Sequence, residues 1–189
     1  IVIPWYDGSK LPGNAAWEET KKLFTKISDE AKQNGMSLLY HNHDFEFTKV
    51  GDEYQYDIMF RDLKGHLDPE PDTCWMKHGG VNPAEYIRKY GNRINVVHLK
   101  DLTYVDGEGK PAYALIGDDG SEAKQGEAEK KTVVLVPLGR GINDFGSILE
   151  ACSDNNVEYA IVEQDNFTGI TPLEGMAESR RYLKDTFGL

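Results

Sequence analysis

The chain has 189 residues, 39% of them hydrophobic, a formal net charge of −11 and only two cysteines. Its length suits one domain with a sizeable core, and its hydrophobic share is that of a globular protein. The sequence is acidic and contains no cluster of basic residues, which argues against nucleic acid as a partner. No apolar run approaches the roughly 18–20 residues that cross a bilayer. Two distant cysteines without CxxC spacing fit a reducing compartment, so the expected location is the cytoplasm.

Short apolar runs alternate with helical patterns along the chain. The first strand is expected over 1–6, followed by a helix over about 15–34 with Asn14 as its N-cap and Gly35 at its end. Further strands are expected at 37–43, 65–68, 94–100 and 157–165, and further helices at 54–63, 83–90, 145–153 and from Pro172 onwards. Five β/α units without hairpin signals predict a parallel sheet covered by helices.

Residues 102–133 interrupt this alternation. They contain several glycines and many charges but little periodicity. A loop of this length is usually functional or mobile. We expect a long excursion over one end of the sheet, as a lid or, in preference, as a solvated insertion within one domain that spans 1–189.

Ionisable side chains, with one glutamine among them, follow four of the predicted strands. The carboxyl ends of parallel strands lie at one edge of a sheet, where ligands bind in α/β folds. Nitrogen and carboxylate ligands together suit Mn²⁺, Mg²⁺, Co²⁺ or Zn²⁺. The side chains concerned are His41, His43, Asp44 and Glu46; Asp68 and Asp72; His98, Lys100 and Asp101; and Glu163, Gln164 and Asp165.

Each of these residues also has a structural interpretation. A single histidine at a strand end is more often a hydrogen-bonded structural residue than a ligand, and aspartates there are favoured helix N-caps. The two-residue period places His98 and Lys100 on one strand face, whereas Asp101 is expected to be an outer partner or a cap. Because four strand ends carry the same chemistry, the metal-site interpretation is favoured.

Four segments resemble, in this order, the sugar phosphate isomerase/epimerase family. They are YHNHDFEF, PDTCWMKHGGVNPAEYIRKYGNRINVVHLKD, PLGRGINDFGSIL and IVEQD. This xylose isomerase-like group includes inosose dehydratase, tagatose 3-epimerase relatives and, distantly, endonuclease IV. The resemblance implies an α/β fold, namely a (β/α)8 TIM barrel. Five β/α units alone cannot close such a barrel, so this chain is expected to supply its last five units.

The resemblance also implies one divalent metal ion, bound by a Glu, an Asp, a His and a second Glu from successive strands. Asp72, His98 and Glu163 match the last three of these ligands. At the first position this chain has His41, so Glu46, five residues further on, is the expected ligand. His41 and His43 are alternative contacts to the metal or to the substrate.

The chemistry that the resemblance implies takes place next to a carbonyl of a sugar or polyol. The metal would stabilise an enediolate, and two groups would remove and return the proton. Glu46 and Glu163 are the candidates for proton transfer. Lys100 is the candidate for neutralising a developing oxyanion, and Arg140 for contacting the substrate, although a simple loop arginine is an equal alternative.

Three reactions share such a site. If the proton returns to the same carbon, the substrate is epimerised, and if it moves to the neighbouring carbon, the substrate is isomerised. If a β-hydroxyl is expelled instead, the substrate is dehydrated. An isomerase or epimerase is expected because it is the broadest description of these motifs, with an inosose-type dehydratase as the alternative. The partner is then a small sugar or polyol, and a homo-oligomer is compatible with the sequence.

Two other classes are weaker. An endonuclease IV-like phosphodiesterase would need more metal-binding histidines than the five present and a basic face. A non-catalytic sugar-binding module would keep the fold and bind no metal.

Overall fold

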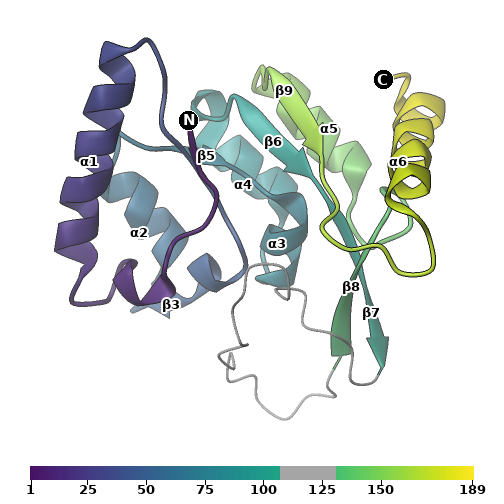
Figure 1. Cartoon of the computed structure of the whole chain (residues 1–189), viewed down its shortest axis with the longest axis horizontal. Helices are drawn as coiled ribbons and strands as arrows, with labels where there is room; N and C mark the ends of the chain where they lie inside the picture. Colours follow the sequence, from purple (N-terminus) through teal and green to yellow (C-terminus); the bar gives the residue numbers. More distant parts are fainter. Residues whose placement is uncertain (107–130) are drawn as a thin grey trace. The chain divides into compact units, whose positions relative to one another are not determined.

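The computed structural model describes residues 1–106 and 131–189 (Figure 1). The chain divides into two compact units, each described by itself below. The first unit comprises Ile1–His98 and Ser147–Ala160, and the second comprises Leu99–Gly146 and Ile161–Leu189.

Short strands and longer helices alternate through the described residues. The strands are β1 (Val2–Ile3), β2 (Leu39–His41), β3 (Lys49–Val50), β4 (Glu53–Tyr54), β5 (Asp68–Glu70), β6 (Val96–Leu99), β7 (Asp101–Asp106), β8 (Lys131–Val136) and β9 (Tyr159–Val162). The α-helices are α1 (Trp17–Gln33), α2 (Gln55–Asp62), α3 (Thr73–His78), α4 (Pro83–Tyr90), α5 (Phe145–Asp154) and α6 (Pro172–Phe187). Single 3-10 turns lie at Gly8–Lys10, Phe45–Phe47 and Gly91–Arg93.

Parallel strands form the framework of the first unit. β1 pairs with β2 and β2 pairs with β5, all in parallel. A parallel bridge between Asp72 and His98 links the end of β5 to β6, and the N–H of Tyr159 in β9 donates to the carbonyl of Asn95 just before β6. The strands therefore follow one another in chain order, which confirms the predicted parallel arrangement.

The helices of the first unit follow from the sequence pattern. In α1, Trp17, Phe24 and Ala31 recur every seven residues and are all buried, so one stripe of the helix packs inward. Pro83 occupies the first turn of α4, and the side chain of Asn82 caps that helix through the N–H of Ala84.

An aromatic cluster makes up much of the core of the first unit. Tyr40, Tyr56 and Phe60 are fully buried and pack edge to face, with ring centroids 6.4 Å apart for Tyr40 and Phe60 and 4.6 Å for Tyr56 and Phe60. Phe47 stacks on Tyr56 from the segment that follows β2. This segment is therefore anchored in the core and cannot be treated as a free loop.

Some predicted boundaries were wrong. The strand expected at 65–68 lies at β5, where Pro69 and two acidic neighbours hide the strand signal. Asn14 was predicted to be the N-cap of helix α1, but the N-cap position is Ala16, which makes no side-chain capping bond. The side chain of Asn14 instead donates to the carbonyls of Gly8 and Leu11.

Two hairpins were missed by the sequence analysis. β3 pairs with β4, and in the second unit β7 pairs with β8, both antiparallel. The segment expected to be a loop over 102–133 thus has strand at both ends, where Thr, Tyr and Val side chains favour extended backbone. Residues 107–130 of that segment lie outside the described residues.

The second unit also contains α6, which begins at a capping box. The hydroxyl of Thr171 accepts from the N–H of Glu174, and the Glu174 carboxylate accepts from the N–H of Thr171. Across the part of the chain that the structure describes, no helix has the length and apolarity that a membrane span requires.

Two buried tyrosines of the first unit should respond oppositely to loss of the hydroxyl. The Tyr56 hydroxyl is buried without a hydrogen-bond partner in the described part of the chain, whereas the Tyr40 hydroxyl donates to Glu46 at 2.8 Å. We expect Tyr56→Phe to raise the free energy of unfolding by about 1 kcal/mol, and Tyr40→Phe to lower it by about 1–3 kcal/mol. Urea unfolding of the two variants measures this, and equal effects of the same sign would contradict the assigned hydroxyl environments.

Candidate metal centre

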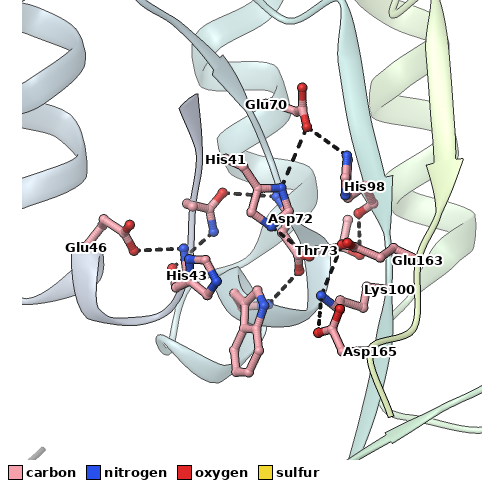
Figure 2. Close-up of polar contacts among 12 residues, drawn as sticks. His41, His43, Glu46, Glu70, Asp72, Thr73, His98, Lys100, Glu163 and Asp165 are labelled. Atoms are coloured by element: carbon pink, nitrogen blue, oxygen red, sulfur yellow. Dashed lines mark hydrogen bonds and ion pairs between the residues drawn. The ribbon is translucent and has the colours of Figure 1, made fainter. Parts of the chain in front are cut away.

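Two histidines and a glutamate lie together at the carboxyl ends of β2, β5 and β6. Nε2 of His98 lies 2.7 Å from Oε1 of Glu70, and Nδ1 of His41 lies 3.7 Å from the same oxygen. The strand register places His41 directly opposite Glu70. One carboxylate therefore faces both imidazole rings, as Figure 2 shows.

The charge state of Glu70 follows from these neighbours. Its side chain is only 4% exposed, and burial alone would raise its pKa. The hydrogen bonds and charges of His41 and His98 outweigh burial and lower the Glu70 pKa to about 2. Glu70 is thus an ionised acceptor that can orient both rings.

Asp72 brings a second carboxylate to the same place. It follows β5 and caps α3, because its Oδ1 accepts from the N–H of Trp75 at 2.9 Å. Its Oδ2 lies 3.6 Å from Nε2 of His41. The Asp72 N–H donates to Oδ1 of Asn42 at 3.0 Å, so both the backbone and the side chain are held in place (Figure 2).

His41, Asp72 and His98 form a group that could hold a metal ion. One ligand atom from each lies within 4.8 Å of the others. Ligands at about 2.0–2.2 Å from a metal ion lie up to roughly 4 Å apart, so small shifts would bring this set onto one ion. Two imidazoles and a carboxylate form a mixed nitrogen and oxygen set, which fits a divalent cation such as Mn²⁺, Co²⁺ or Zn²⁺.

Glu46 lies apart from this group. It is fully buried in the 3-10 turn Phe45–Phe47. Oε1 accepts from the hydroxyl of Tyr40 and Oε2 from the N–H of His43, both at 2.8 Å. The structure thus places the expected first ligand in a hydrogen-bonded site of its own, while His41 takes the place beside Asp72.

His43 contributes an aromatic surface. Its ring stacks on Phe45 with centroids 5.6 Å apart and an interplanar angle of 9°, and it lies 5.6 Å from the ring of Trp75. The side chain is buried, and its backbone N–H is held by Glu46. These contacts fix the ring of His43 by packing.

In the second unit a buried lysine joins two carboxylates. Nζ of Lys100 lies 3.1 Å from Oε2 of Glu163 and 2.6 Å from Oδ2 of Asp165 (Figure 2). The side chain of Lys100 is only 2% exposed, so its charge needs these partners. The N–H of Glu163 donates to the carbonyl of Leu99, which continues the pairing of β9 with β6.

Asp101 holds a loop of the second unit. Its carboxylate accepts from the backbone N–H groups of four residues, at distances of 2.9–3.1 Å: Leu102, Gly139, Gly141 and Asn143. Burial raises the pKa of Asp101 even though these hydrogen bonds favour the ionised form. A Cβ on Gly141 would lie 2.3 Å from Oδ1 of Asp101, so this position requires glycine.

Arg140 lies in the loop that Asp101 holds. It is exposed and pairs with Glu178 of α6 at 2.7 Å. The loop geometry thus presents this arginine to solvent, next to Arg181, Glu174 and Thr168 in a shallow groove of the second unit.

A family model described as the xylose isomerase-like TIM barrel matches residues 1–186. The chain belongs to this family. It is 30% identical over its full length to an inosose dehydratase of Clostridium perfringens and 26% identical to one of Geobacillus thermodenitrificans. In each case it spans 61% of the relative, about three fifths of its length.

Solved structures show the same fold. A sugar phosphate isomerase/epimerase from Parabacteroides distasonis aligns with a TM-score of 0.65 at 22% identity, over 90% of this chain and 55% of that one. A D-psicose 3-epimerase aligns with a TM-score of 0.59 at 15% identity, over 99% and 62%. These similarities confirm the α/β barrel fold that the resemblance implied, and the chain corresponds to part of such a barrel.

Glu70 and Asn42 were not predicted from the sequence, and no specific role was predicted for Asp165. Glu70 stands two residues before Asp72 in DPEPD, so the two-residue period could have placed both on one side of the chain. It was hidden because the strand was placed too early. Asn42 lies between the two histidines and carries no charge, and nothing in its spacing distinguishes it.

The buried carboxyl of Glu46 should make stability depend on pH. Burial raises the Glu46 pKa from 4.5 to about 8, although its hydrogen bonds to Tyr40 and His43 act in the opposite direction. Between these values the folded protein holds a proton that the unfolded chain releases, so the free energy of unfolding falls as pH rises. The change is up to about 5 kcal/mol, at about 1.4 kcal/mol for each pKa unit.

The variant Glu46→Gln, which carries no titratable group, should lack this part of the slope. Urea unfolding of native protein and variant from about pH 4.5 to about pH 8 measures the difference. The native protein should lose stability relative to the variant across that range, and parallel curves would show that Glu46 is ionised throughout.

Proposed function

We propose that this chain is part of a divalent metal-dependent enzyme that removes a proton next to the carbonyl of a sugar or polyol. The observation that carries the proposal is the cluster of His41, Asp72 and His98 backed by Glu70. The family supports it, since its members named above include a sugar isomerase/epimerase and dehydratases. The proposal treats residues 1–189 as five β/α units of a single barrel domain.

The proposed ligands are His41, Asp72 and His98, with Glu163 as the fourth by its match to the family motif. His41 replaces Glu46 in this set because both oxygens of Glu46 already accept hydrogen bonds from other groups. Glu70 would hold the far nitrogens of the two rings, as carboxylates commonly do behind metal-bound histidines. A divalent ion bound there would supply a Lewis acid for the carbonyl oxygen.

Glu163 is proposed as the group that removes the proton. A general base must be ionised, and the ammonium of Lys100 at 3.1 Å stabilises its negative charge. Lys100 itself is held by Asp165, so we propose that it fixes the charge and orientation of Glu163 as well as balancing charge on the substrate. His43 and Arg140 remain the proposed substrate contacts.

Dehydration is the outcome that we propose in place of isomerisation. The relatives that match this chain over 98–100% of its length at 26–30% identity are named inosose dehydratases. The isomerase and epimerase structures are at most 22% identical, and their similarity establishes the fold alone. A keto-polyol that can lose a β-hydroxyl as water is therefore the proposed substrate class.

The metal site can be tested without a substrate. Asp72→Asn keeps an oxygen that can cap α3 but removes the charge, so it should lower the affinity for Mn²⁺ by at least about 100-fold, beyond the 10–100-fold typical of outer partners. Asp154→Asn, on an exposed position of α5, is the matched control and should bind as the native protein does. Titration calorimetry measures both, and equal affinities would rule out Asp72 as a ligand.

The reaction can be tested in D₂O with Mn²⁺ and a cyclic keto-polyol. We expect loss of water and formation of a conjugated enone, followed by ultraviolet absorption and mass spectrometry. Incorporation of solvent deuterium with inversion and no loss of water would instead establish an epimerase. If neither product forms although the protein binds Mn²⁺ fully, the substrate belongs to a different class and the proposal is contradicted.

A further inference from the structure

We propose that Glu46 is a positioning residue: with Asn42 it braces the segment after β2, so that His41 is held facing Asp72. This inference rests on the metal site proposed above. This brace consists of the side chains of Tyr40, Asn42 and Glu46 and the backbone of His43.

The carboxylate of Glu46 spans the position of His41. One oxygen accepts from Tyr40, the residue before it, and the other from the N–H of His43, two residues after it, both at 2.8 Å. Tyr40 lies in the middle of β2 and is fully buried. The carboxylate therefore ties the strand to the turn that follows it, on both sides of the histidine.

Asn42 extends the brace to the neighbouring strand. Its Nδ2 donates to the carbonyl of His43 at 3.1 Å, and its Oδ1 accepts from the N–H of Asp72 at 3.0 Å. The side chain is fully buried. The same few residues thus fix His41 and Asp72 relative to each other.

The brace requires a polar side chain at position 46 that can form two hydrogen bonds, one with the Tyr40 hydroxyl and one with the His43 N–H. An apolar residue there would leave the Tyr40 hydroxyl and the His43 N–H buried without an acceptor, at about 1–3 kcal/mol for each group. Glutamine has nearly the same shape, and its oxygen can accept from His43 while its amide donates to the Tyr40 oxygen. A ligand role, in contrast, would require the carboxylate charge. The two roles are therefore separated by the Glu46→Gln substitution.

The experiment compares Glu46→Gln, Glu46→Ala and His41→Ala with the native protein. Amide hydrogen exchange at His43 in the metal-free protein reports the brace, and Mn²⁺ affinity reports its effect on the site. We expect Glu46→Ala to speed exchange at His43 and to weaken Mn²⁺ binding, each by about tenfold or more, whereas Glu46→Gln keeps both within about threefold. His41→Ala should lose more affinity than either, while exchange at His43 stays close to native.

Two results would overturn the brace. If Glu46→Gln loses Mn²⁺ affinity as severely as His41→Ala, Glu46 is a ligand. If Glu46→Ala matches the native protein in both measurements, the segment needs no brace. Should Glu46→Ala fail to fold by near-ultraviolet circular dichroism, Glu46→Gln decides alone, since it must fold and bind.

The proposed brace and the proposed metal site can be disproved independently of each other. A native protein that binds no Mn²⁺ would overturn the proposed metal site. The brace would then be decided by exchange at His43, which requires no metal and compares Glu46→Gln with Glu46→Ala.

Discussion

The contact between Glu70 and the two histidines governs the geometry of the candidate metal centre. A buried carboxylate needs charged or hydrogen-bonding partners, and here it obtains them from Nε2 of His98 at 2.7 Å and Nδ1 of His41 at 3.7 Å. The rings are thereby turned so that Nε2 of His41 faces Asp72. Without Glu70, both rings would lose the charged acceptor that orients them on this side.

Three of the buried ionisable side chains in the described residues each have a specific set of hydrogen-bonding or charged partners. Asp101 accepts from four backbone N–H groups, and Lys100 lies between two carboxylates in the second unit. Glu46 has one hydroxyl and one N–H. Such fully satisfied networks are rigid, and each removed partner leaves a costly buried group. This favours a preformed site over one that assembles around its ligand.

Much of this organisation could be predicted from the sequence because it depends on periodicity. Alternating apolar runs located most strands and helices, and the ends of parallel strands had to meet at one edge, which brought Asp72 and His98 together as predicted. The motifs identified the family correctly. These features follow from spacing along the chain, which one sequence contains in full.

The remaining features depend on loop geometry, which spacing does not determine. Whether His41 or Glu46 faces Asp72 is decided by the 3-10 turn Phe45–Phe47, whose aromatic side chains join the core and turn Glu46 towards Tyr40. Glu70 was missed because Pro69 hides a three-residue strand. In both cases, contacts between residues distant in the sequence determine a local structure that the local motif does not predict.

Anomalous diffraction from crystals of this chain grown with Mn²⁺ tests the proposed metal site most directly. We expect one anomalous peak within bonding distance of His41, Asp72 and His98, with Glu70 still on the far nitrogens of the two rings and Glu46 still hydrogen-bonded to Tyr40. A peak bonded to Glu46, or ordered side chains without any peak at saturating Mn²⁺, would contradict it.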